Sequence, residues 1–60
     1  MYDRIKELAQ QHGMTIAALE QAAGIANGTI GKWRDTNGAT VASLEKIAKA
    51  LNMDIRDLLE

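Results

Sequence analysis

Residues 15–33, TIAALEQAAGIANGTIGKW, decide the fold of this chain, and they predict two short helices joined by a tight turn. Thr15 is suited to cap the first helix, because its hydroxyl oxygen can accept a hydrogen bond from a free amide of the first turn. Gly24 falls where this helix should end, since a residue without a Cβ readily adopts the left-handed conformation. Asn27, another good capping residue, marks the predicted start of the second helix.

The apolar residues of this stretch recur at helical spacing. Ile16, Leu19 and Ala23 form one apolar stripe on the first predicted helix. Ile30 and Trp33 are three residues apart and share one face of the second helix. A helix, a short turn with glycine and a second helix together have the layout of a helix-turn-helix, here over about residues 15–34.

These residues, in this order, resemble the helix-turn-helix family of Cro-type phage repressors, also called the XRE family. The resemblance rests on the apolar positions and the turn glycine, which are Leu19, Ala23, Gly24, Ile25, Ile30 and Trp33. The run GIANGTIGKW is similar to a subgroup of small repressors from Gram-positive bacteria and their phages, and SLEKIAKALNMDIRDLL is similar to the family's fourth and fifth helices. The resemblance covers the chain from about Ile5 to Leu59. It implies an all-α, lambda-repressor-like bundle of five short helices, with residues 1–60 as a single domain.

Size and composition agree with a small all-α domain. The chain has 60 residues, of which 47% are apolar, with one Trp, one Tyr, and no Phe or Pro. Cysteine is absent, which excludes disulfides and thiol chemistry. The charged segment MYDRIKELAQ is not a signal peptide, and no apolar run reaches the roughly 18 residues of a membrane span. We therefore expect a soluble protein of the cytoplasm.

Three further helices are predicted outside the central stretch. They cover residues 2–12, ended by Gly13; residues 41–51, capped by Thr40 and ended by Asn52; and residues 55–59, capped by Asp54. Their apolar faces consist of Ile5, Leu8 and Ala9 in the first, Val41, Leu44, Ile47, Ala48 and Leu51 in the second, and Ile55, Leu58 and Leu59 in the third. His12 is expected to be a partly exposed residue at a helix end.

The second helix of the central stretch, predicted over about residues 28–34, is weak by intrinsic propensity. Gly28 and Gly31 each cost roughly 1 kcal/mol relative to alanine in a helix. Two explanations remain open. The glycines allow close contact with the preceding helix, or they let the backbone approach a ligand such as a phosphate or a base edge.

For two large side chains in this stretch, Glu20 and Trp33, the sequence must be used to predict whether they point outward or into the core. The family usually keeps a small residue where Glu20 stands, because that position faces the next helix, and we expect the Glu20 side chain to bend outward. Trp33 lies near Lys32 and Arg34, where it could stack on a base. Its spacing with Ile30 and its position in the family favour a buried core anchor.

The chain offers little material for catalysis or for metal binding. It has one histidine, no cysteine, and Ser43 as its only serine. A general acid–base or nucleophilic site needs at least two groups converging in a pocket, and one histidine with scattered carboxylates gives no metal-ligand set. We expect no enzyme activity, no metal and no cofactor.

The resemblance implies binding to double-stranded DNA, with the second helix of the motif in the major groove. The base-reading positions fall on Asn27, Gly28 and Lys32; asparagine can pair with adenine and lysine can donate to guanine. The expected contacts to the DNA backbone are Thr15, Ile16, Thr29, Arg34, Thr36 and Asn37. A net charge of −1 counts against a nucleic-acid partner, although only the charge of the binding face is decisive.

Few cationic residues are available, so we expect a homodimer on a two-fold operator, with Ile55, Leu58 and Leu59 at the dimer interface. Two alternatives remain. One is a protein-interaction module, such as the antitoxin-like domain of a toxin pair; the other is the N-terminal domain of a longer repressor. DNA binding predicts positive potential near Lys32 and Arg34, with Glu20 turned away. A protein-interaction module predicts an exposed apolar patch of more than several hundred Å².

Overall fold

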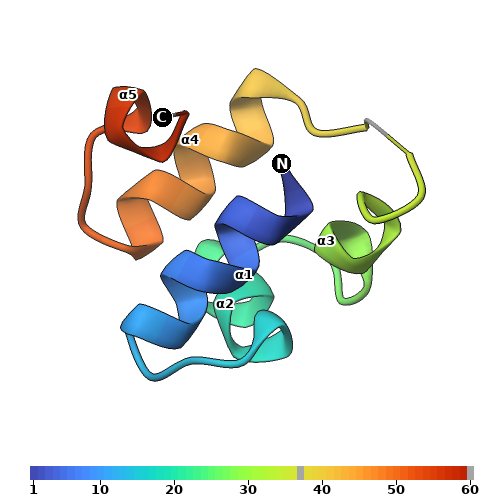
Figure 1. Cartoon of the computed structure of the whole chain (residues 1–60), viewed down its shortest axis with the longest axis horizontal. Coiled ribbons are helices and arrows are strands. Elements are labelled where there is room, and N and C mark those ends of the chain that lie inside the picture. Colours follow the sequence, from blue (N-terminus) through green and yellow to red (C-terminus); the bar gives the residue numbers. More distant parts are fainter. Residues whose placement is uncertain (37, 60) are drawn as a thin grey trace.

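A computed structural model describes residues 1–36 and 38–59 of the chain. These residues form five α-helices and no strand, which confirms the all-α prediction (Figure 1). The helices are α1 (Tyr2–Gln11), α2 (Ile16–Ala23), α3 (Thr29–Lys32), α4 (Val41–Ala50) and α5 (Ile55–Leu58). None of them is long and apolar enough to cross a membrane.

The helices pack around a core of aliphatic side chains and one tryptophan. α2 packs against α1, α3 and α4, and α4 also packs against α5. α3 lies at one edge of the bundle, on the side opposite α5 (Figure 1). The largest fully buried side chains come from all five helices and are Ile5, Leu19, Ile30, Ile47 and Leu58.

Three helices end in the same way, with a left-handed residue followed by an apolar residue that packs on the core. Gly13, Gly24 and Asn52 have φ values of 67°, 73° and 55° and follow α1, α2 and α4. After α2, the Ile25 amide donates to the Glu20 carbonyl at 3.0 Å and the Gly24 amide donates to the Gln21 carbonyl at 3.2 Å. This pair of bonds is the Schellman motif. The Met14 amide donates to the Ala9 carbonyl at 2.8 Å and the Met53 amide to the Ala48 carbonyl at 2.9 Å in the same way, so the predicted ends of all three helices are confirmed.

Side-chain caps begin three of the helices, as predicted. Thr15 accepts from the Ala18 amide at 3.0 Å, and Thr40 accepts from the Ser43 amide at 3.1 Å. Asp54 accepts from the Arg56 amide at 2.8 Å.

The structure departs from the predicted helices at two places. α3 covers only Thr29–Lys32, and its N-cap is Gly28 rather than Asn27. Val41, which the spacing placed on the buried face of α4, is 67% exposed. It is the first residue of α4, so it extends beyond the part of that helix that the core covers.

Candidate nucleic-acid interface

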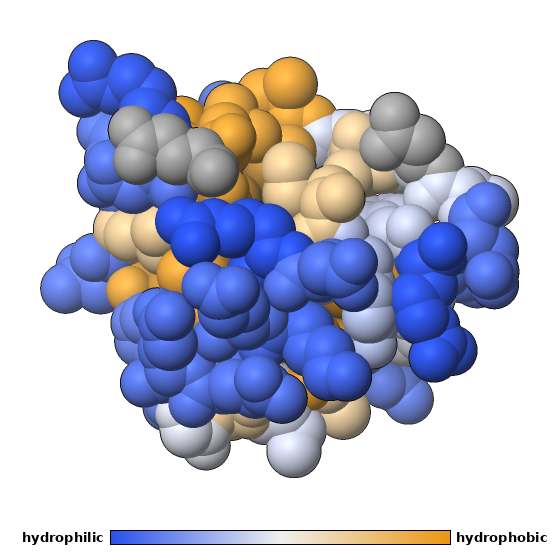
Figure 2. Space-filling view, in the orientation of Figure 1, coloured by the Kyte–Doolittle hydropathy of each residue, from blue (hydrophilic) through white to orange (hydrophobic). Residues whose placement is uncertain are grey.

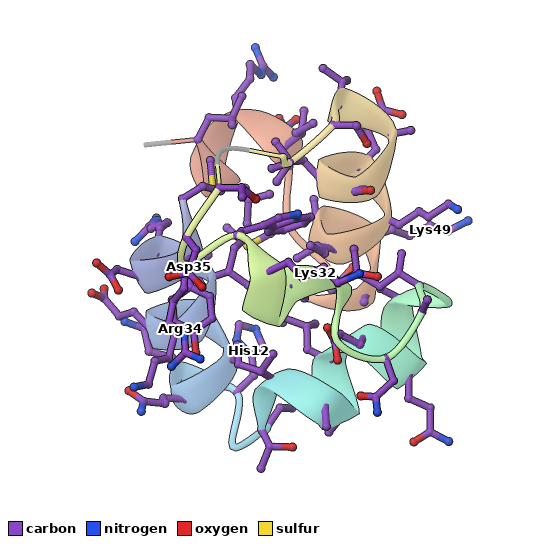
Figure 3. The ribbon with its side chains drawn as sticks, turned by 90° about the vertical axis from the view of Figure 1, so that its right-hand side faces the viewer. His12, Lys32, Arg34, Asp35 and Lys49 are labelled. Carbon is purple, nitrogen blue, oxygen red and sulfur yellow. The ribbon has the colours of Figure 1, made fainter. Side chains whose placement is uncertain are left out.

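α3 presents one face to solvent and the other to the core. In Figure 3, Lys32 lies near the middle of the view on α3, with Arg34 and Asp35 to one side, near α1, and Lys49 of α4 to the other. On the opposite face, Ile30 is 0% exposed and Trp33 is 8% exposed. Trp33 is therefore a core anchor, as its spacing predicted, and its ring is not free to stack on a base.

The prediction that Glu20 bends outward is wrong. Its side chain is 2% exposed, and its carboxylate lies against the start of α3. Oε1 accepts from the Gly28 amide at 3.0 Å, and Oε2 accepts from the Ile30 amide at 2.8 Å. Glu20 can stay buried because these two bonds replace the hydrogen bonds that its carboxylate would make to water. The first amides of a helix also carry partial positive charge, which favours a carboxylate beside them.

Glu20 therefore does the work that was assigned to Asn27. Gly28 has no side chain with which to cap α3, and the Asn27 side chain is exposed and makes no hydrogen bond within the described residues. The side-chain amide of Asn27 is thus available at the edge of α3.

The two glycines of this segment do not serve contact with α2. A Cβ at either Gly28 or Gly31 would meet no heavy atom of another element within 4 Å. The first explanation for these glycines is therefore wrong. Gly28 has a φ of 92°, a conformation that disfavours every L side chain, so its backbone alone explains the choice of glycine. No such reason applies to Gly31, which has open space around it.

The remaining polar residues of α3 lie at its two ends. Thr29, the first residue, is half-buried, and its hydroxyl makes no hydrogen bond within the described part of the chain. Lys32, the last residue, is exposed, and its ammonium group forms no ion pair with any described residue. Lys32 thus presents an uncompensated positive charge beside the α3 surface.

Arg34 is held by an aromatic side chain that no sequence pattern singled out. Its guanidinium carbon lies 5.6 Å from the centroid of the Tyr2 ring, in cation–π range. Tyr2 is 32 positions away, so no local pattern connects the two residues. Arg34 is exposed, but Asp35 lies on the same side and lowers the local positive charge (Figure 3).

The threonines assigned to the DNA backbone differ in what they can still donate. The Thr15 hydroxyl only accepts, from Ala18, so its own hydrogen is free to reach an anionic oxygen. The Thr36 hydroxyl donates to the Lys32 carbonyl at 3.0 Å, so its only hydrogen is already engaged.

The other two residues assigned to the DNA backbone are Ile16 and Asn37. The Ile16 side chain is half-buried and packs against the core, so its backbone amide at the start of α2 is the only polar group it could offer to DNA. Asn37, the remaining predicted contact, lies outside the described residues.

The three residues assigned to a dimer interface lie in different environments. Leu58 is 0% exposed in the chain's own core, Ile55 is half-buried against that core, and Leu59 is 54% exposed. Val41 and Met1 are the other large exposed apolar residues of the described chain. Figure 2 shows hydrophobic surface along the upper part of the molecule, where α4 begins.

Within the described residues, no group of three or more His, Asp or Glu side chains lies close enough together to hold a metal ion. His12 lies at the end of α1, exposed, with Nδ1 2.9 Å from the Leu8 carbonyl oxygen.

Comparison with known proteins places this arrangement in a family. A family model described as a Cro/C1-type helix-turn-helix DNA-binding domain matches residues 4–60. The match includes all of α2 and α3 and the turn that joins them. Comparisons with curated proteins and with solved structures returned no match.

Proposed function

The chain belongs to the family of Cro/C1-type helix-turn-helix DNA-binding domains, and from this we propose that it is a sequence-specific transcriptional regulator, of the phage-repressor kind, that reads the major groove with α3. Residues 1–60 act as one DNA-binding domain, in the cytoplasm, where a bacterial operator lies.

One observation carries this proposal. Glu20 satisfies the amides at the start of α3, so the exposed Asn27 side chain is not needed as a cap there. At the other end of α3, Lys32 is exposed and forms no ion pair within the described residues. Asparagine presents a donor and an acceptor that match the N7 and N6 edge of adenine, and lysine donates to O6 and N7 of guanine. We assign base reading to these two residues. Gly28 contributes close backbone approach only, because it has no side chain.

Contacts to the DNA backbone support the same docking. Thr15 has a free hydroxyl hydrogen at the start of α2, and Thr29 has one at the start of α3. Arg34 is exposed and held against Tyr2, so less side-chain entropy is lost when it binds a phosphate. Phosphate contacts of this kind fix the position of the protein on the duplex but do not read its sequence.

We further propose that the regulator binds its operator as a homodimer. A surface with Lys32 and Arg34 as its cations provides few phosphate contacts per protomer, and a dimer doubles that number. Leu59 and the exposed part of Ile55 are the apolar surface that α5 offers to a partner.

The test is a selection of binding sites from random duplex DNA, followed by gel-shift titrations of the selected duplex over a series of salt concentrations. Asn27→Ala and Lys32→Ala should each lower the affinity by about 10-fold or more, and each should relax the base preference at its own position. Lys32→Ala should also reduce the salt dependence by about one ionic contact, whereas Asn27→Ala should leave it unchanged.

Lys6→Ala is the matched control, because it removes the same charge from an exposed position on α1, outside the α2–α3 motif. Its affinity for the selected duplex should stay within about 3-fold of the wild type. If the folded wild-type protein binds no duplex even at low salt, DNA reading by this chain is wrong. The protein-interaction module would then be the better hypothesis.

A further inference from the structure

Glu20 is the only charged side chain buried in the described part of the chain, and it has no cationic partner there. Its two carboxylate oxygens bind the Gly28 and Ile30 amides, which are eight and ten residues away. These two amides flank Thr29, the first residue of α3. The carboxylate therefore holds the first turn of α3 at two points, one on either side of Thr29.

α3 cannot hold this position by itself. It is four residues long and contains Gly31, and its N-cap, Gly28, has no side chain that could cap it. The core holds its inner face through Ile30 and Trp33, but these contacts leave the helix start without an acceptor. Glu20 supplies that acceptor from the neighbouring helix.

We propose that Glu20 is a positioning residue for DNA recognition, which sets the location of the α3 N-terminus and, through it, the side chains of Asn27 and Lys32. This inference rests on the proposed function. It also assigns the amides of Gly28 and Ile30 to Glu20, so a DNA phosphate has no access to them.

The requirement is for a carboxylate, and not only for a side chain of this size. Glutamine has almost the same shape, but it offers one acceptor oxygen and one NH₂ donor. With Gln at this position, one of the two α3 amides keeps its bond and the other faces a donor. A buried amide without a partner is costly, so the α3 start should shift or fray.

In the Glu20→Gln variant, the direction of the change in DNA affinity separates a positioning role from a simple electrostatic effect. Removing a negative charge near the DNA should strengthen binding if only Coulomb attraction changes. We expect the opposite, a loss of about 10-fold or more for the selected duplex, because α3 is no longer held. Affinity for random duplex and the salt dependence should stay close to the wild type, since no cationic contact is removed.

Asp35→Asn is the matched control for charge. Asp35 is exposed three residues after the end of α3, and its side chain makes no hydrogen bond or ion pair within the described residues. Neutralising it should leave affinity unchanged or raise it. Ile47→Val is the control for stability, because it removes one buried methyl group from α4 without touching α3. All variants are compared at a temperature at which circular dichroism shows them folded.

Glu20→Asp is the second variant, and it decides the question if the glutamine variant does not fold. Aspartate keeps the charge but is one methylene shorter, so it cannot reach both amides in the present geometry. It should bind the selected duplex more weakly than the wild type, and hydrogen exchange at the Gly28 and Ile30 amides should be faster.

The outcomes are distinguishable. If the wild type selects a duplex and both Glu20 variants bind it as tightly as the wild type does, this inference is wrong while the proposed function stands. If the wild type selects no duplex, the proposed function fails and the inference fails with it.

Discussion

Gly31 is the residue at which stability and function are most clearly opposed. It lies inside α3 with a helical backbone, and a methyl group there would meet no other element within 4 Å. Alanine is therefore compatible with the fold at this position. Since glycine weakens the helix without any gain in packing, we infer that its small size serves the approach of DNA to α3.

Gly31→Ala should accordingly stabilise the protein by up to about 1 kcal/mol, because alanine loses less backbone entropy in a helix than glycine. The same methyl group should weaken binding to the selected duplex, since in the proposed docking it stands between the α3 backbone and the DNA. Thermal unfolding and gel-shift titration of one preparation measure both effects. Gly24→Ala is the control, because its φ of 73° makes alanine unfavourable and the unfolding temperature should fall. A Gly31→Ala protein that binds DNA as tightly as the wild type would contradict the close approach.

At the scale of single helices, local signals fix the ends of most of them. Thr15, Thr40 and Asp54 cap α2, α4 and α5, and each is a residue whose side chain can reach an amide two or three positions ahead. Such bonds depend on neighbours in the sequence and could be predicted from it. The start of α3 could not, because its acceptor, Glu20, belongs to another helix.

The difference between local signals and contacts from another helix also explains which placements of Trp33 and Arg34 could be predicted. The burial of Trp33 followed from its spacing with Ile30, since helical periodicity is a local property. The contact between Arg34 and Tyr2 depends on where the segment after α3 lies relative to the start of α1, and no periodicity contains that information. A signal for Glu20 was nevertheless present, because a helix whose N-cap is a glycine needs an acceptor from elsewhere for its first amides.

α5 is the helix whose start should respond to pH. The Arg56 guanidinium, followed by the Arg56 amide, holds the pKa of the Asp54 carboxyl below its ordinary value. A group with a lowered pKa in the folded state stabilises the protein above the pKa it has when unfolded, and this stabilisation is lost as the pH falls through the folded pKa. The wild type should therefore be more stable than Asp54→Asn near neutral pH, and the difference should shrink below about pH 4.

Thermal unfolding of both proteins between neutral pH and about pH 2.5 measures this difference. Asparagine still accepts from the Arg56 amide, so the comparison isolates the charge rather than the cap. Arg56→Gln should raise the pKa of Asp54 toward its ordinary value and move the loss of stability to higher pH. A difference that does not change with pH would show that the ion pair contributes nothing to folding.

At the scale of the whole molecule, the distribution of charge matters more than its sum. The net charge of −1 includes carboxylates that the structure has already engaged. Glu20 is bound to amides, Glu7 lies 3.6 Å from Arg4, and Asp54 is paired with Arg56. Each ion pair engages one cation along with its carboxylate, so the two pairs leave the net charge unchanged, and the Glu20 carboxylate lies beside α3 itself. A slightly acidic chain is compatible with DNA binding because the exposed cations Lys32 and Arg34 lie together at the α3 face.

The apolar surface of the whole molecule bears on its assembly. Leu59 is 54% exposed at the end of the chain's last helix, whereas Leu58 beside it is fully buried. Leu59→Ser should therefore leave folding almost unchanged but weaken the proposed homodimer, because it removes apolar area only from the surface. Sedimentation equilibrium should show a loss of dimer at concentrations at which the wild type associates, and binding to a two-fold operator should lose its cooperativity while binding to a single half-site is retained.

Val41→Ser is the matched control for the dimer, since Val41 is even more exposed, at 67%, but lies at the start of α4 rather than beside α5. It should associate like the wild type. Dimer loss in the Val41 variant alone would move the interface from α5 to the start of α4, close to the segment that follows α3. The two protomers would then present their α3 helices in a different relative orientation, and the half-site spacing of the selected operator would differ from about one helical turn. The spacing and the sedimentation result must therefore agree, which makes the dimer geometry testable without a structure of the complex.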